Sequence, residues 1–430
     1  MKRRAFLGRT GVGLAAGALA GTIPGSAALS ALSGTTAPEP LPPSGTNEWE
    51  AVRAQFDLSS EYIHLAGLLL ASHPAPVREA IERHRRGLNG NPVHYLYGEG
   101  SRLEREVRRA AAAYMGAKPA DIALTDSTTM GLAMVYNGLD LRAGQEILTT
   151  EHDHRATHES LQYRAARSGA PLRRIPLYRR LNGVSSEEIV DALVRAVRPE
   201  TRVVAVTWVH SSTGLKLPIR AMADALASVN AGRAEGDRAL LCVDGVHGFG
   251  VEDAGVEDLG CDFFIAGTHK WLFGPRGTGV VWGHPRAQDA ASPTIPSFTR
   301  DGSWGGLMTP GGFHSFEHRW ALREAFEFHQ RIGKARVAGR IHTLNRQMKE
   351  GLARMPHVAL YTPMAEELSA GLVCFDVRGM SPAQVVGRLR ERGIIASRTP
   401  YAPSYARVTP GLINTPEEVN AALAAVRAMG

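Results

Sequence analysis

Short hydrophobic runs alternate with longer segments of helical periodicity from about residue 100 onward. Six β-rich runs stand out: IAL at 122, EILTT at 146, TRVVAVTWV at 201, ALLCVDG at 239, FFIAG at 263 and GVVWG at 279. Helical stretches separate most of them, including 185–198 and 219–230, and an amphipathic helix at 101–116 precedes them. Strands that alternate with helices are usually joined by crossovers, so this order predicts an α/β fold with a largely parallel sheet.

The pattern changes after the last of these runs. A long helix is predicted over 320–355, a strand near 370–376 and a helix near 381–392. The chain has 430 residues, more than one compact core usually serves. We therefore expect an N-terminal segment with a large domain over 49–330, and a smaller C-terminal α+β domain over 331–430.

The first residues differ from the rest of the chain. Met-Lys-Arg-Arg-Ala-Phe-Leu-Gly precedes an apolar run rich in Gly and Ala, which ends in small residues. A basic start, an apolar stretch and small residues are typical of a signal peptide, and the arginine pair resembles a twin-arginine export signal. We predict this signal over 1–33, a linker over 34–48, and a periplasmic or extracellular location. No stable membrane association is expected after the signal is removed.

The net charge of +7 does not indicate a nucleic-acid partner. Four basic residues among the first nine supply more than half of it, and no basic tract with interleaved aromatics follows. The cysteines, Cys242, Cys261 and Cys374, lie in apolar runs. Three sparse cysteines do not make a disulfide framework, so they are interpreted as buried thiols.

Two residues at strand ends carry the strongest chemical signal. Asp244 ends the run LLCVD, and Lys270 follows the run FFIAG. A cofactor that stores electrons in a pyridinium ring needs a carboxylate beside the ring nitrogen and a lysine amine that can form an imine. Pyridoxal 5'-phosphate, held by Lys270 as a Schiff base, meets both requirements. The alternative is a buried Asp–Lys ion pair that joins two strands.

The Thr-His-Lys-Trp run, the Gly-Pro-Arg-Gly-Thr-Gly that follows it and the upstream VDGVHG together resemble the class V aminotransferase family. The resemblance covers roughly residues 60–425. It implies the fold type I architecture of pyridoxal-phosphate enzymes, an amino-acid substrate and a homodimer. The family includes cysteine desulfurases, kynureninases and isopenicillin-N epimerases.

The resemblance also implies roles for residues of the cofactor site. TDSTTMGLAMVYN (125–137) resembles the family's phosphate-binding turn, so Thr128 and Thr129 would meet the phosphate at a helix start. His152 takes the place of the histidine that stacks on the pyridine ring. His154 is a second candidate for the same face.

Further positions follow from other matching segments. Ser211 and His247 would lie near the ring oxygen, and His269 could contact phosphate or transfer protons. Arg407 falls on the position that binds the substrate carboxylate, and Arg398 is a second candidate. A guanidinium suits that task because it can meet both carboxylate oxygens.

The chain departs from the family pattern in several places. No cysteine lies between Arg398 and Arg407, which disfavours a desulfurase with a thiol nucleophile there, and Cys374 is a poor replacement. The segment 311–320 lacks the family's Gly-Thr pair. Gly267 stands where desulfurases have a phosphate-binding serine, which leaves Thr268 as the substitute. Asn91-Pro92 resembles the isopenicillin-N epimerase-like branch.

Several reactions remain open. Lys270 is the expected general base, and an aminotransferase-type or epimerase-like reaction is favoured over a C–S or β-lyase reaction. A metal-dependent hydrolase is a rival from another class, because imidazoles and a carboxylate cluster closely enough to bind zinc. Its residues are His152, Asp153, His154 and His158. A non-catalytic binding protein is the second rival.

Overall fold

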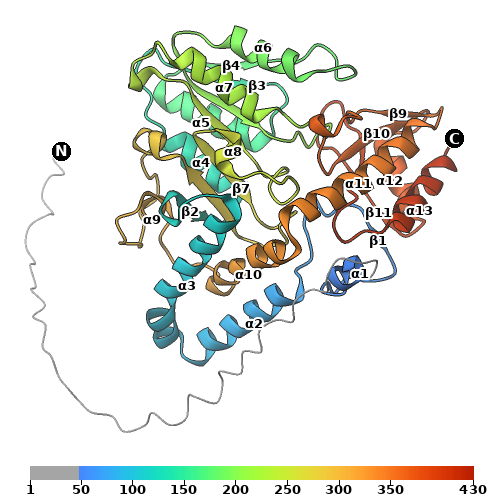
Figure 1. Ribbon diagram of the computed structural model, residues 1–430, viewed down its shortest axis with the longest axis horizontal. Coiled ribbons are helices and arrows are strands. Elements are labelled where there is room, and N and C mark those ends of the chain that lie inside the picture. Colours follow the sequence, from blue (N-terminus) through green and yellow to red (C-terminus); the bar gives the residue numbers. More distant parts are fainter. Residues whose placement is uncertain (1–47) are drawn as a thin grey trace, which may run out of the picture. The chain divides into compact units, whose positions relative to one another are not determined.

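A seven-stranded sheet forms the centre of the fold (Figure 1). This computed structural model describes residues 48–430, so the predicted signal peptide (1–33) and the linker up to residue 47 lie outside the described residues. Glu48, the last residue of the predicted linker, begins helix α1 (Glu48–Arg53). Among the described helices, none combines the length and apolar character required of a membrane span.

The sheet confirms the predicted α/β class and contains all six predicted strands. Its order is β2-β8-β7-β6-β5-β3-β4. The strands are β2 (Ile122–Thr125), β3 (Glu146–Thr150), β4 (Leu172–Ile175), β5 (Thr201–Thr207), β6 (Leu240–Asp244), β7 (Phe263–Gly267) and β8 (Gly279–Gly283). β8 alone runs in the direction opposite to the other six strands, antiparallel to its neighbours β2 and β7. The segment that joins β7 to β8 contains no helix, so it cannot form the crossover that a parallel pair needs.

Helices cover both faces of this sheet, which explains why its strands are continuously apolar. They are α4 (Thr128–Gly138), α5 (Arg155–Ser168), α6 (Ser186–Ala196), α7 (Ile219–Asn230), α8 (Val256–Leu259) and α9 (Trp304–Met308). Along β5, Val204 and Val206 belong to one hydrophobic cluster, whereas Val203 and Ala205 belong to another. Because side chains alternate between the two faces of a strand, both faces of β5 are buried.

Two helix boundaries have local causes. Asn91 separates α2 (Ala75–Gly90) from α3 (Pro92–Met115), because its side chain caps α3 by accepting from the N–H of His94. The single helix predicted over 320–355 is wrong. The segment forms α10 (Phe316–Ile332) and α11 (Lys334–Ala353), divided at Gly333, whose φ of 96° lies outside helical conformations.

A second, antiparallel sheet of order β12-β13-β10-β9 lies in the C-terminal part. Its strands are β9 (Val358–Leu360), β10 (Val373–Val377), β12 (Ser397–Arg398) and β13 (Ala406–Val408), and its helices are α12 (Pro382–Arg390) and α13 (Pro416–Arg427). The chain's early strand β1 (Ile63–His64) pairs in parallel with β11 (Ile394–Ile395). Leu65 then packs into the hydrophobic cluster of the C-terminal part. Residues far apart in sequence therefore share this part of the core.

Candidate active site

A cavity of about 130 Å³ lies at the carboxyl ends of β5, β6 and β7. Its lining includes all eight residues predicted to bind the cofactor: Thr128, Thr129, His152, Ser211, Asp244, His247, His269 and Lys270. Ligands of α/β sheets usually bind at this edge, because loops after successive strands converge there. A larger cavity, of about 670 Å³, lies near the opposite strand ends and includes none of these residues.

Asp244 and Lys270 are placed by consecutive neighbours in the sheet. Asp244 is the last residue of β6 and is buried, and its Oδ1 accepts from the N–H of Val246 over 3.2 Å. Lys270 follows β7, and its Nζ lies 3.3 Å from Nε2 of His247. Burial raises the pKa of Asp244 and lowers the pKa of Lys270, while each charge opposes the shift of the other. The lysine contacts His247, not Asp244, so the two do not form the inter-strand ion pair weighed above.

The start of α4 forms one end of the cavity. The side chain of Ser127 caps this helix by accepting from the N–H of Met130, and Thr128 Oγ1 accepts from the N–H of Gly267 over 2.8 Å. A Cβ at position 267 would lie only 2.8 Å from that oxygen, so the close approach requires glycine. The hydroxyl of Thr268 bonds to Thr278 instead of lining the cavity. The hydroxyl beside Gly267 is therefore that of Thr128, and not that of Thr268, which was expected to substitute for the serine of desulfurases.

The histidines after β3 take different positions. His152 lines the cavity, and one face of its ring stacks on Tyr178 with centroids 4.3 Å apart. Only the other face is available to a ligand. Burial lowers the pKa of His152 to about 4, so the ring is neutral at physiological pH. His154 also lines the cavity, and its Nδ1 caps α5 by accepting from the N–H of Ala156.

The other two members of the candidate zinc cluster are bound elsewhere. Asp153 Oδ2 accepts from the hydroxyls of Thr149 and Thr150, and Oδ1 accepts from the N–H of Thr207. The ring of His158 donates to the carbonyl of Thr150 over 2.7 Å. Within residues 48–430, no group of three or more His, Cys, Asp and Glu side chains is arranged to hold a metal. The residues do not converge as the metal-hydrolase hypothesis requires.

The two candidate carboxylate anchors differ in burial. Arg407 on β13 is buried, and it donates to the carbonyl of Ser211 over 2.6 Å and to the hydroxyl of Ser397 over 3.1 Å. Ser211 lines the cavity, so the guanidinium of Arg407 lies directly behind this lining without being part of it. The side chain of Arg398 on β12 is exposed and does not line the cavity.

Three residues near the cavity were missed by the sequence analysis. Tyr178 supports the ring of His152, and the hydroxyl of Tyr401 lies 2.6 Å from Ser211 Oγ. Trp271 donates its indole N–H to Nδ1 of His247. Two of the three had a usable signal, because Trp271 directly follows Lys270 and Tyr401 lies between the two candidate arginines. Tyr178 had none.

None of the three cysteines lines the cavity. Cys242, Cys261 and Cys374 are all buried, and burial raises the pKa of the Cys374 thiol to about 12. A thiol with a raised pKa is a poor nucleophile, because the thiolate is the reactive form. The site therefore provides no cysteine nucleophile.

The donor set fits pyridoxal phosphate part by part. A buried carboxylate, Asp244, would face the ring nitrogen, and the amine of Lys270 would attach the cofactor. The start of α4, with Thr128 and Thr129, would receive the phosphate, because helix N-termini carry unpaired N–H groups and positive potential. The glycine at 267 keeps space at that end. The ring nitrogen, the point of attachment and the phosphate thus each have a matching group in one cavity.

Known proteins match this chain over most of its length. The model of the aminotransferase class-V family matches residues 71–399. Isopenicillin N epimerase from Streptomyces clavuligerus is 27% identical over 394 residues, covering 87% of this chain and 96% of that protein. A cysteine desulfurase from Klebsiella pneumoniae (strain 342) is 28% identical over 418 residues, covering 88% and 97%.

A solved structure agrees with both. A mutant of C-DES with glycine covalently linked to its PLP cofactor superposes with a TM-score of 0.80 at 25% identity, covering 88% of this chain and 99% of that one. The family model spans most of the described residues, and the cavity offers partners for the ring nitrogen, the imine-forming carbon and the phosphate of the cofactor. This chain is a pyridoxal-phosphate enzyme of the class-V aminotransferase family.

Proposed function

We propose that Lys270 holds the cofactor and that the enzyme removes the α-proton of an amino acid, in an aminotransferase-type or epimerase-like reaction. The observation that carries this proposal is that the Lys270 amine and the Asp244 carboxyl line one cavity at the strand ends. Bound pyridoxal phosphate acts as an electron sink for the charge that develops at the substrate Cα.

The residues around the cavity have distinct tasks in this proposal. Lys270 is the general base, since burial lowers the pKa of its amine towards the physiological range. Arg407 binds the substrate carboxylate, and Asp244 is the counter-ion beside the cofactor ring. Epimerase-like chemistry is supported by the likeness to isopenicillin N epimerase and by the lack of a cysteine nucleophile at the site.

The visible absorbance of the purified protein tests this proposal while amino acids are added one at a time. A yellow band that shifts with particular amino acids is expected. Borohydride reduction followed by mass spectrometry should locate the cofactor on Lys270. Lys270→Ala should lose this label and lower turnover about a hundredfold to ten-thousandfold, the range for a lost general base. Lys118→Ala, at an exposed lysine, is the control. Full activity in Lys270→Ala would refute the assignment.

C–S or β-bond cleavage is the second candidate. The likeness to a cysteine desulfurase over 88% of this chain favours it. Incubation with cysteine, cystine and other β-substituted amino acids would separate the two candidates. Released sulfide or a keto acid without an amino acceptor would indicate a lyase. Exchange of the α-proton with solvent deuterium, without elimination, would support the first candidate.

We infer a homodimer from the family and from exposed apolar side chains around α3 and α10. Tyr97 and Phe313 are 82% and 84% exposed, and Phe298 is 68% exposed. Phe298 and Phe313 lie on adjoining segments, because the N–H of Gly311 donates to the carbonyl of Pro296. Sedimentation velocity should find a dimer, and Tyr97→Lys with Phe313→Lys should weaken it. A monomeric wild-type protein would contradict this inference.

The arginine pair at the start of the chain supports export by the twin-arginine route. Replacing Arg3 and Arg4 by lysine should retain the protein in the cytoplasm, as measured by cell fractionation. Arg9→Lys, outside the pair, is the control. Unchanged export of the double variant would remove the twin-arginine assignment.

A further inference from the structure

Trp271 and Lys270 are consecutive residues whose side chains reach the same imidazole. The indole N–H of Trp271 donates to Nδ1 of His247 over 3.3 Å. Nε2 of the same ring lies 3.3 Å from Lys270 Nζ. His247 thus links the tryptophan to the reactive amine through its two ring nitrogens.

This link determines which ring nitrogen carries the proton. An indole N–H can only donate, so Nδ1 of His247 must accept and cannot itself be protonated. Burial lowers the pKa of His247 well below its ordinary value, so the ring is neutral. Its single proton therefore lies on Nε2 and faces Lys270. An Nε2–H can donate to the lone pair of an amine, whereas it cannot accept from an ammonium group.

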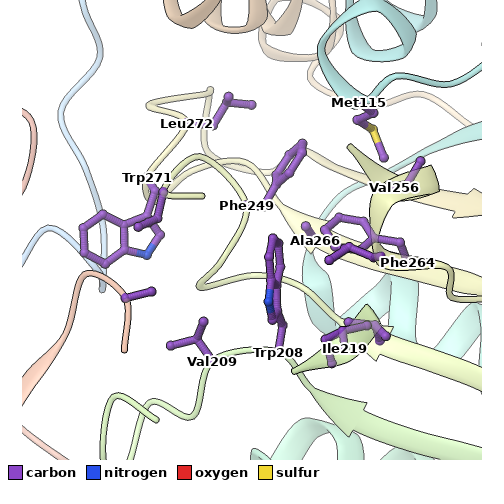
Figure 2. Packing of buried hydrophobic residues seen from close by; sticks show 14 of the residues in the cluster. Met115, Trp208, Val209, Ile219, Phe249, Val256, Phe264, Ala266, Trp271 and Leu272 are labelled. Carbon is purple, nitrogen blue, oxygen red and sulfur yellow. The ribbon is translucent and has the colours of Figure 1, made fainter. Parts of the chain in front are cut away.

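The tryptophan is held in place by close packing. A Cβ at Gly371 would lie 2.7 Å from Cη2 of Trp271, and a Cβ at Gly250 would lie 2.9 Å from its carbonyl carbon. On another side, a Cβ at Gly411 would lie 3.5 Å from Cζ3. Trp271 is 6% exposed, within the hydrophobic cluster that also contains Trp208 and Phe249 (Figure 2). The indole therefore has little freedom to turn its N–H away from His247.

We propose that Trp271 is a positioning residue that holds His247 in the Nε2–H tautomer and thereby favours the uncharged form of the Lys270 amine. The inference rests on the proposed role of Lys270. It concerns only groups of this chain, so it can be tested on the apo-protein without turnover. It also explains how a residue outside the cavity lining influences the amine inside it.

Other charged or titratable groups face Lys270 and must be kept constant in a test. Asp244 lies on β6, Arg407 on β13 and His154 at the start of α5, while His269 precedes the lysine. The charge of Asp244 raises the pKa of Lys270, and the charge of Arg407 lowers it. A substitution at Trp271 leaves all of these side chains unchanged. A change in the titration of Lys270 would then report the link through His247.

The first measurement is the tautomer of His247 in the wild-type apo-protein. Imidazole ¹⁵N chemical shifts distinguish the two tautomers, and the signal that His247→Gln removes identifies the residue. We expect the Nε2–H form. An Nδ1–H form would overturn the proposal, and this result requires no variant at Trp271.

The second measurement is the rate at which acetic anhydride acylates Lys270 in the apo-protein, followed by peptide mass spectrometry over a range of pH. Trp271→Phe should slow acylation about twofold to tenfold below the midpoint of the titration, as expected for one lost hydrogen bond. Trp208→Phe removes the same groups from a buried tryptophan of the same cluster whose indole N–H does not bond to His247, and should leave the rate unchanged.

A double variant separates positioning from a general packing effect. If Trp271 acts through His247, then Trp271→Phe should cause no further slowing in a His247→Ala background. Equal slowing in both backgrounds, or an unchanged rate in Trp271→Phe alone, would overturn the proposal. The proposed function could fail separately. If the enzyme turned over none of the amino acids tested, the tautomer of His247 and the acylation rate of Lys270 in the apo-protein would be unaffected.

Discussion

Arg407 is a buried guanidinium whose hydrogen-bond partners in the described chain are uncharged. It donates to the carbonyl of Ser211 and the hydroxyl of Ser397. Burial lowers its pKa, but arginine remains charged in proteins. A buried charge without an ionic partner is costly, so binding of an anion beside it would be favourable. An amino-acid carboxylate supplies that anion, and this requirement distinguishes Arg407 from the exposed Arg398.

Replacement of each arginine in turn tests this distinction. Arg407→Gln should weaken amino-acid binding about tenfold to a hundredfold, because hydrogen bonds to charged groups contribute more than neutral ones. The spectral titration of the cofactor band with substrate measures the dissociation constant. Arg398→Gln is the matched control and should change it less than about threefold. A larger loss in Arg398→Gln than in Arg407→Gln would assign the carboxylate to β12 instead.

At the scale of elements, Gly333 decides the length of two helices. The N–H of Gly333 still donates to the carbonyl of His329, and its own carbonyl accepts from Val337 at the start of α11. Between them the backbone adopts a φ of 96°, which side-chain-bearing residues rarely adopt. The chain can therefore turn here from α10, which packs on α2 and α3, to α11, which packs on α13.

Two glycine-to-alanine substitutions should have opposite effects on stability. Gly333→Ala should lower the free energy of unfolding by about 1–3 kcal/mol, because it strains the backbone. Gly339 lies in the middle of α11 with nothing within 4 Å of an added Cβ, so Gly339→Ala should raise it by about 0.5–1 kcal/mol. Urea unfolding measures the free energy of unfolding of both variants, provided that its dependence on urea concentration stays the same. Equal effects of the two substitutions on the free energy of unfolding would show that the backbone conformation at Gly333 does not disfavour alanine.

At the scale of the whole molecule, buried neutral histidines make the fold sensitive to acid. His210 is fully buried, and neither of its ring nitrogens has a hydrogen-bond partner among the described residues. Burial lowers its pKa to about 3 from an ordinary value of 6.5, and the pKa of His329 shifts similarly. Between these values the unfolded chain binds more protons than the folded one. Stability therefore falls as the pH drops from 6.5 towards 3.

His210→Leu should reduce this acid sensitivity. The free energy of unfolding should fall less steeply from about pH 6 to about pH 4, by up to about 1.4 kcal/mol per pH unit. Denaturant unfolding at a series of pH values measures the slope. His94→Leu, at an exposed position on α3, is the control and should leave the slope as in the wild type. An unchanged slope in His210→Leu would show that this ring is not kept neutral by the fold.

The sequence by itself determined the α/β class, the six strands and the placement of Asp244 and Lys270 at the ends of two of them. It could do so because the alternation of short hydrophobic runs with helical segments is a local property of the chain. The carboxyl ends of parallel strands also converge at one edge of a sheet. Tertiary structure alone decided that Gly333 divides a helix and that Thr128 bonds Gly267. It also brought Tyr401 to Ser211, across 190 positions of sequence, and buried Arg407 while leaving Arg398 exposed. Those contacts depend on how distant segments pack, and no local pattern of hydrophobic and polar residues encodes which distant side chain a given group will meet.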